Sequence, residues 1–145
     1  MSWSDISVGD ELDVLEVSMT ATRIVAGAIA TRDFMPVHHD RAYANTQGAP
    51  DIFMNILSTT AYCSRFLTDW AGPEAMVKRL AIRLGVPVFP GSTLTFAGTV
   101  VGTTRDGDEG TVDVEFRATN DLGDHVTGTA TLSLPLSAGA AASAP

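Results

Sequence analysis

The densest group of chemically active side chains is a short stretch rich in acid and histidine. It contains Asp33, His38, His39 and Asp40. Asp33 and His38 lie five residues apart with a proline between them, which favours a loop over a helix. A carboxylate and an imidazole held close together can orient one water molecule and move two protons. The spacing therefore indicates general acid–base chemistry, and an exposed polar loop remains the alternative interpretation.

Other kinds of site have weaker support in the sequence. Two adjacent histidines usually diverge, and no third ligand recurs at a fixed spacing, so we expect no metal. The single cysteine, Cys63, excludes an internal disulfide and is expected to be a small apolar core residue. His125 falls in an expected strand, and we expect it at the surface or at a sheet edge. The sequence has no P-loop, GxGxxG or GxSxG motif.

The first half of the chain is expected to be mainly helical. Residues 11–19 alternate imperfectly and indicate a first strand, after which Thr22 can cap a helix. Residues 33–41 are then expected to form the loop described above. An apolar segment follows, and residues 52–67 predict a long helix that is apolar nearly all round and therefore buried. Gly72 and Pro73 are expected to end it.

The second half predicts strands. Its runs are rich in Val, Thr, Leu and Phe, and glycine-containing turns separate them. The expected strands cover residues 77–84, 92–104, 111–119 and 125–134. One buried helix followed by such a meander predicts an α+β fold, with an antiparallel sheet wrapped around a long central helix. We expect a single domain over residues 1–136 and a disordered tail over 137–145.

The charge of the chain restricts its partners. The 145 residues include nine Lys and Arg against seventeen Asp and Glu, for a net charge of −8. This balance disfavours nucleic acid and anionic membrane surfaces. No apolar run is long enough for a membrane span, and the N-terminus does not resemble a signal peptide, so the expected setting is the cytoplasm. Only residues 51–85 carry a net positive charge. Within them, Lys78, Arg79 and Arg83 would either bind an anionic ligand or form an ordinary solvent-exposed charged face.

Two stretches of the sequence resemble one enzyme family. Residues 33–38, DFMPVH, match a D-x-N-P-x-H motif except that Met35 replaces the asparagine. Residues 83–94, RLGVPVFPGSTL, match R-F-x-x-P-V-x-x-G-D-x-L at five positions: Arg83, Pro87, Val88, Gly91 and Leu94. In this combination the chain resembles the MaoC-like, R-specific enoyl-CoA hydratases over roughly residues 10–135. The resemblance implies a hot-dog fold.

The same resemblance implies a reaction and a site. Asp33 and His38 would be the catalytic pair that adds water to a 2-enoyl-CoA thioester. The family's helix opens with a His-Gly pair, which Met54 and Asn55 replace here, and the backbone N–H near Asn55 would form the oxyanion hole. Arg83, with Arg79 and Lys78, would bind the coenzyme A part of the substrate. No separate cofactor is implied.

A narrower resemblance concerns assembly. The variants RDFMPVHHDR, DIFMNIL and TDWAGP are similar to the small MaoC-like subunit of heteromeric hydratases of actinobacterial steroid side-chain degradation. This implies a second MaoC-like subunit, in a heterodimer or heterotetramer, whose shorter helix leaves room for a steroid. Met35 and Met54 would make the rim of the site apolar.

Three alternatives remain open at this stage. The first is a homodimeric R-specific hydratase of short or medium acyl chains. The second is a hot-dog acyl-CoA thioesterase, but residues 52–68 contain no Asp or Glu to act as its catalytic carboxylate. The third is a non-catalytic half that only completes a dimer, which has little chemical reason to retain both Asp33 and His38.

Overall fold

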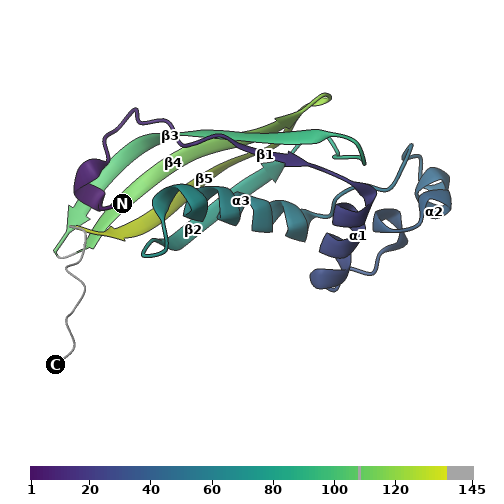
Figure 1. The fold of residues 1–145 in the computed structure, drawn as a ribbon, viewed down its shortest axis with the longest axis horizontal. Coiled ribbons are helices and arrows are strands. Elements are labelled where there is room, and N and C mark those ends of the chain that lie inside the picture. Colours follow the sequence, from purple (N-terminus) through teal and green to yellow (C-terminus); the bar gives the residue numbers. More distant parts are fainter. Residues whose placement is uncertain (108, 137–145) are drawn as a thin grey trace.

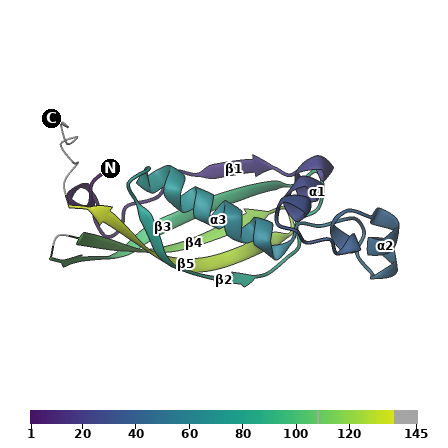
Figure 2. The same ribbon diagram turned by 90° about the horizontal axis from the view of Figure 1, so that it is seen from below.

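One antiparallel sheet wraps around one long helix in the computed structural model, which describes residues 1–107 and 109–136 (Figure 1). The five strands are ordered β1-β3-β4-β5-β2, and every neighbouring pair is antiparallel. The long helix, α3, lies across one face of this sheet (Figure 2). The expected α+β fold with a central helix is confirmed, whereas the predicted tail over 137–145 lies outside the described residues.

The strands follow the alternation of apolar and polar residues in the sequence. Their bounds are β1 Leu15–Ser18, β2 Met76–Leu84, β3 Thr93–Asp106, β4 Glu109–Asn120 and β5 Gly123–Pro135. The last four agree with the predicted strands within a few residues. β1 is shorter than the predicted 11–19, because the chain before it is joined to β3 only at separate points, such as the bridge between Glu11 and Thr99.

The helices are α1 Ala21–Ala30, α2 Arg41–Thr46 and α3 Ile56–Ala71, with short 3-10 turns η1 Trp3–Asp5 and η2 Pro36–His38. The hydroxyl of Thr20, rather than the predicted Thr22, caps α1 by accepting a hydrogen bond from the backbone N–H of Arg23. α3 ends as predicted at Gly72, whose φ of 88° lies in the left-handed region that glycine tolerates.

α3 begins four residues later than predicted. Residues 52–55 are apolar enough to continue the helical pattern, but their backbone groups bond elsewhere: Phe53 N donates to Val37 O and Met54 N to Val88 O. Asn55 then caps the helix, because its side-chain oxygen accepts the backbone N–H of Ser58 at 3.1 Å. Asparagine is a strongly preferred N-cap residue, and this preference outweighs the apolar run.

The core lies between α3 and the sheet. Cys63, Phe66 and Leu67 of α3 are completely or almost completely buried, and Phe66 stacks on Phe96 of β3 with ring centroids 5.6 Å apart. Fully burying a side chain such as Phe or Leu stabilises the fold by about 1.5–3 kcal/mol. The alternate side chains of the strands face the opposite, outer side of the sheet, where β4 exposes Asp113, Glu115 and Arg117.

α1, α2 and η2 gather at one end of the molecule, beyond the start of α3, and the N-terminus lies at the other end (Figure 1). α1 packs against α3 at Gly27, where a Cβ atom would overlap the Ser58 hydroxyl oxygen. Glycine weakens a helix, but here its missing side chain lets the two helices touch. Within the described residues, no helix is both long and apolar enough to cross a lipid bilayer.

Candidate active site

The loop between α1 and α2 brings Asp33 and His38 together. α1 ends at Ala30, Arg32 turns the chain with a φ of 58°, and Asp33 follows it. Pro36 then begins η2, which turns Val37 and His38 inward. His38 Nε2 lies 3.5 Å from Asp33 Oδ2. The predicted pair is therefore assembled, at a separation longer than a direct hydrogen bond, so that both groups can contact one water molecule.

The orientation of His38 is fixed by its other ring nitrogen. Nδ1 lies 2.7 Å from the carbonyl oxygen of Phe53, which can only accept, so Nδ1 carries a proton and donates it. In the neutral ring Nε2 is then unprotonated and faces Asp33. The edge-to-face contact with the Phe53 ring, at 5.1 Å between centroids, holds the imidazole in place. His38 is only 8% exposed.

The side chain of Asn55 joins the site. Its Nδ2 donates to Asp33 Oδ2 at 3.0 Å and to Thr31 Oγ1 at 2.9 Å, while its oxygen caps α3. The hydrogen bond from Asn55 is the main cause that lowers the pKa of Asp33, against the opposing effect of burial; Met35 N–H and His38 add smaller contributions. Asp33 is therefore a carboxylate at neutral pH.

Sequence reasoning assigned only the backbone of Asn55 to the site and missed the role of its side chain. The signal available was an asparagine before a helical run, which indicates a cap. The backbone N–H of Asn55 donates no hydrogen bond to any residue in the described part of the chain. It lies at the N-terminus of the sixteen-residue α3, where the helix dipole favours negative charge. A backbone N–H in this position can serve as an oxyanion donor, and the assignment stays a prediction.

His125 is buried, so the expectation of a surface or edge position is wrong. Its exposed fraction is 4%. Nδ1 donates to Val86 O at 2.6 Å, and Nε2 lies 2.9 Å from the hydroxyl oxygen of Thr59 on α3. The same hydroxyl lies 3.3 Å from Asn55 O. His125 thus ties the 83–94 stretch to the first turn of α3, and its burial lowers its pKa.

His39 lies apart from the pair. Its Nε2 is 3.2 Å from Phe34 O, and its side chain is exposed. Asp40 serves α2, since its carboxylate accepts the backbone N–H of Tyr43 as the helix cap. Among the described residues, no group of three or more His, Cys, Asp or Glu side chains could hold a metal ion. Cys63 is fully buried, which raises the pKa of its thiol to about 12 and leaves it unreactive.

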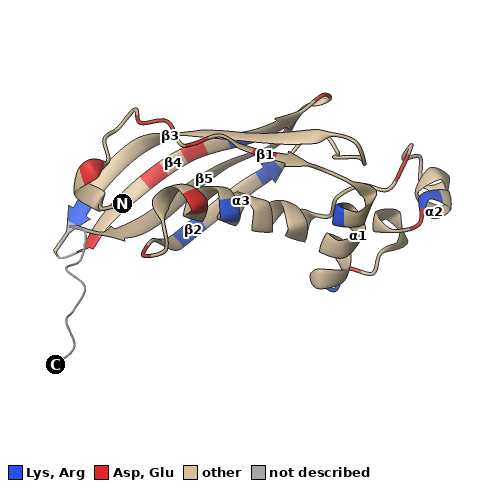
Figure 3. Ribbon diagram, in the orientation of Figure 1, with Lys and Arg blue, Asp and Glu red and all other residues tan. Residues whose placement is uncertain are grey.

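The three basic residues of the sequence prediction all lie on β2. Lys78 forms an ion pair with Glu109 at 3.2 Å. The neighbouring Arg79 is also exposed, because the register shifts between Val77 and Arg79. Ile82 packs on the core, so Arg83 points to the outer face of the sheet. Figure 3 shows basic positions on β2 and acidic positions on β4. Coenzyme A binding by these residues stays a prediction.

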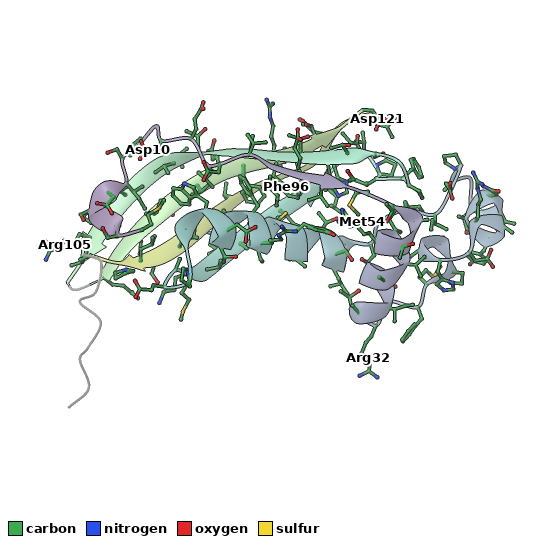
Figure 4. All side chains as sticks on the ribbon, viewed as in Figure 1. Asp10, Arg32, Met54, Phe96, Arg105 and Asp121 are labelled. Atoms are coloured by element: carbon green, nitrogen blue, oxygen red, sulfur yellow. The ribbon has the colours of Figure 1, made fainter. Side chains whose placement is uncertain are left out.

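The rim of the site is only partly as predicted. Met54 is 5% exposed and belongs to the core near the start of α3 (Figure 4), so it does not line the rim. Met35 and its neighbour Phe34 are exposed, as are Ile56 and Leu57 in the first turn of α3. These four apolar side chains lie on the segments that carry Asp33 and Asn55, and together they are called the site rim.

The central helix has no carboxylate in its buried part. Asp69, the one acid in α3, is exposed near the C-terminal end and pairs with Arg65 at 3.1 Å. A thioesterase that acts through a helix carboxylate therefore lacks its residue in this chain.

Comparisons with known proteins identify the family of the chain. The MaoC like domain family matches residues 5–121. The chain is 46% identical over 127 residues to the 3-oxo-4,17-pregnadiene-20-carboxyl-CoA hydratase beta subunit of Mycobacterium tuberculosis, which covers 88% of this chain and 95% of that protein.

Solved structures share the fold. A chain of the ChsH1–ChsH2 complex from Mycobacterium tuberculosis superposes with a TM-score of 0.83 at 47% identity, over 88% of this chain and 98% of that one. The (R)-hydratase from A. caviae involved in PHA biosynthesis gives a TM-score of 0.80 at 24% identity, over 90% and 98% of the two chains. At that lower identity, the likeness extends to the hot-dog fold alone.

Proposed function

Because the chain belongs to the MaoC-like domain family, we propose that it is a subunit of an enoyl-CoA hydratase that adds water to a 2-enoyl-CoA thioester. The observation that carries the proposal is the pairing of Asp33 with His38. Asn55 contacts Asp33 through its side chain, and its backbone N–H has no hydrogen-bond partner among the described residues. General acid–base groups and an oxyanion donor are the two requirements of this reaction.

The hydration needs one proton to leave water and one to reach the substrate. A water molecule between Asp33 and His38 attacks the β-carbon while the pair takes its proton, and the α-carbon receives a proton from the pair. The lowered pKa of Asp33 keeps it in the carboxylate form, which is the form that can accept a proton. The two groups face each other at 3.5 Å, so one water molecule can contact both of them.

The thioester oxygen gains negative charge as the double bond is attacked. The N–H of Asn55 at the start of α3 would stabilise that charge, aided by the helix dipole. His38 is held by Phe53 O and Asp33 by Asn55, so little reorganisation is needed before reaction.

The proposed acyl group is a steroid side chain. Support comes from the identity to the pregnadiene-carboxyl-CoA hydratase subunit and from the apolar site rim beside Asp33. An apolar rim favours a bulky hydrocarbon because burying apolar surface is the main driving force for its binding.

The proposed partner is a second hydratase subunit. The similar chain of known structure was solved in a complex of two proteins. β2 forms one edge of the sheet, its outer side carrying no strand among the described residues. Such an edge presents unpaired N–H and C=O groups to another chain. A partner on this edge would extend the sheet and cover one mouth of the site.

The test is steady-state hydration of a 2-enoyl-CoA by the complex with its partner. Asp33→Asn and His38→Ala should each lower the rate by about 10²–10⁴-fold, the usual contribution of such groups. His39→Ala is the control and should cost little, because its ring faces Phe34 O. Release of free thiol in place of hydration would instead support a thioesterase, and near wild-type rates in both variants would refute the assignment.

The coenzyme A contact is tested in the same assay. Arg83→Ala should raise KM more than it lowers kcat, because an ion pair with the phosphates is similar in the ground and transition states. If KM and its salt dependence stay unchanged, Arg83 has a structural role.

A further inference from the structure

A buried polar pair, His125 of β5 and Thr59 of α3, has no part in the chemistry proposed above. His125 is 4% exposed and Thr59 is fully buried. His125 Nε2 lies 2.9 Å from Thr59 Oγ1, although the two residues are 66 apart in the sequence. Polar groups in a core need such partners, because a buried group without one loses its hydrogen bonds to water. The pair therefore constrains how α3 sits against the sheet.

The tautomer of His125 decides the direction of this hydrogen bond. Nδ1 lies 2.6 Å from the carbonyl oxygen of Val86, which can only accept, so Nδ1 carries the proton. Burial lowers the pKa of the ring, which is therefore neutral at neutral pH. Nε2 is then an acceptor, and Thr59 donates its one hydroxyl proton to it. The other acceptor near this hydroxyl, the carbonyl oxygen of Asn55 one turn back, lies farther away at 3.3 Å.

The bond from His125 to Val86 orients the ring and is not needed to hold the loop after β2. Backbone hydrogen bonds already join that loop to β5. Gly85 N–H donates to His125 O at 2.7 Å, and Val86 N–H donates to Asp124 O at 3.0 Å. The two backbones approach so closely that a Cβ atom on Gly85 would overlap Asp124 O. The imidazole is therefore a fixed acceptor directed at the first turn of α3.

This turn contains the proposed oxyanion donor. Thr59 N–H donates to Asn55 O at 3.1 Å, so Thr59 and Asn55 move together. On the other side of Asn55, Met54 N–H donates to Val88 O at 3.0 Å. Val88 belongs to the loop to which the His125 ring is bonded. Asn55 is thus held from both sides against one region of the sheet.

We propose that His125 and Thr59 are positioning residues of the hydratase site. Their hydrogen bond fixes the first turn of α3, and with it the backbone N–H of Asn55 that meets the thioester oxygen. It also fixes the side-chain amide of Asn55 that holds Asp33. The inference rests on the proposed function, because the role belongs to that reaction. The hydrogen bonds of both side chains go to residues other than the catalytic pair, so both act through Asn55.

Thr59→Val tests the hydrogen bond at nearly constant shape, because a methyl group replaces the hydroxyl. In the complex with the second subunit, it should lower kcat for a steroid 2-enoyl-CoA by about 10–100-fold. KM should change little, since the oxyanion contact strengthens only in the transition state. Thr59→Ser keeps the hydroxyl and should retain most of the rate. Thr59→Ala removes the hydroxyl without adding bulk, and it decides the question if the valine variant does not fold.

Thr68→Val is the matched control on the same helix. The Thr68 hydroxyl bonds back to Ser64 O at 3.0 Å, far from Asn55 along α3, so its loss should leave kcat unchanged. His125→Leu should lower kcat about as much as Thr59→Val, and the double variant should be no slower than His125→Leu. The positioning role is overturned if Thr59→Val keeps the wild-type kcat, if Thr59→Ser is as slow as Thr59→Val, or if the double variant shows the product of two separate losses.

A second readout does not depend on activity. The chain contains three asparagines, Asn45, Asn55 and Asn120, so labelling this chain with ¹⁵N-asparagine gives few amide signals in the complex. His125→Leu should shift the backbone and side-chain signals of Asn55 and leave those of Asn45, on α2, in place. Unmoved Asn55 signals would overturn the inference. A wild-type complex without hydratase activity would refute the proposed function, whereas the Asn55 signals would still decide whether His125 positions that residue.

Discussion

At the scale of single residues, the side chain of Asn55 makes two separate sets of hydrogen bonds. Its oxygen caps α3 and its amide holds the carboxylate of Asp33. The position of the catalytic acid is thereby coupled to the position of the helix N-terminus, which carries the proposed oxyanion donor. A shift of one would move the other.

This coupling predicts the effect of removing the amide. Asn55→Ser keeps a hydroxyl that can cap α3, but it loses the hydrogen bond that lowers the pKa of Asp33. The pKa of Asp33 should rise, and the acidic limb of the kcat/KM–pH profile should move to higher pH. Asn55→Ala should show the same shift and also lose about 1 kcal/mol of folding stability with the cap. An unmoved acidic limb in both variants would show that Asp33 does not act through its carboxylate form.

The burial of His125 should make the free energy of unfolding depend on pH. Burial lowers its pKa in the folded protein, whereas the unfolded chain keeps a value near the ordinary 6.5. As the pH falls through 6.5, the unfolded chain therefore takes up a proton first, and the free energy of unfolding should fall. One proton contributes at most about 1.4 kcal/mol per pH unit.

The measurement is urea unfolding of His125→Gln between pH 7.5 and pH 5. The variant should lose stability at neutral pH and show a flatter decline toward acid than the wild type. His39→Gln, at an exposed histidine, should keep the wild-type slope. An identical slope in the wild type and His125→Gln would assign the acid sensitivity to other groups.

At the scale of elements, the contact of α1 with α3 depends on one missing side chain. Replacing glycine by alanine within a helix normally stabilises it by about 1 kcal/mol. Gly27→Ala should do the opposite, by about 1–3 kcal/mol, because the new Cβ would overlap the Ser58 hydroxyl oxygen. Ser58 Oγ is buried without a hydrogen-bond partner in the described residues, so Ser58→Ala alone should be neutral or stabilising.

The double variant Gly27→Ala with Ser58→Ala separates the overlap from other effects. It should recover most of the lost stability, as measured by urea unfolding. If the single and double variants lose the same stability, the overlap with Ser58 is not the cause of the loss. Because α1 leads directly into the loop of Asp33, the single variant should also lower hydratase activity more than a surface substitution of equal cost.

At the scale of the whole molecule, several exposed apolar side chains lie at the start of α3 and on the edge strand β2, where a partner is proposed. Ile56 and Leu57 are about half exposed at the start of α3, and Leu84 is 42% exposed at the end of the edge strand β2. Exposed patches of this kind mark interaction sites. A second subunit would cover them and complete the acyl site.

The chain expressed alone should accordingly be a homodimer of low activity, or insoluble. Co-expression with its second subunit should give a soluble complex that hydrates a steroid enoyl-CoA. Light scattering reports the mass, and crotonyl-CoA serves as the short comparison substrate. Full activity of the lone chain on crotonyl-CoA would overturn the heteromer and favour a simple R-specific hydratase.

The elements that depend on local pattern were predictable from the sequence. Strands β2 to β5 follow an alternation with a period of two residues, which is a property of neighbouring side chains. The pairing of Asp33 with His38 was also accessible, because the turn at Pro36 closes only five residues and needs no distant contact. The end of α3 at Gly72 was predictable for an equally local reason, because glycine readily adopts the left-handed backbone conformation found there.

Contacts between distant residues were decided only by the tertiary structure. Asn55 reaches Asp33 over 22 residues of sequence, and His125 reaches Thr59 over 66. Neither spacing is a pattern, because the fold alone determines which loops meet. The start of α3 was mispredicted for the same reason, since Val37 and Val88 accept the hydrogen bonds of Phe53 and Met54.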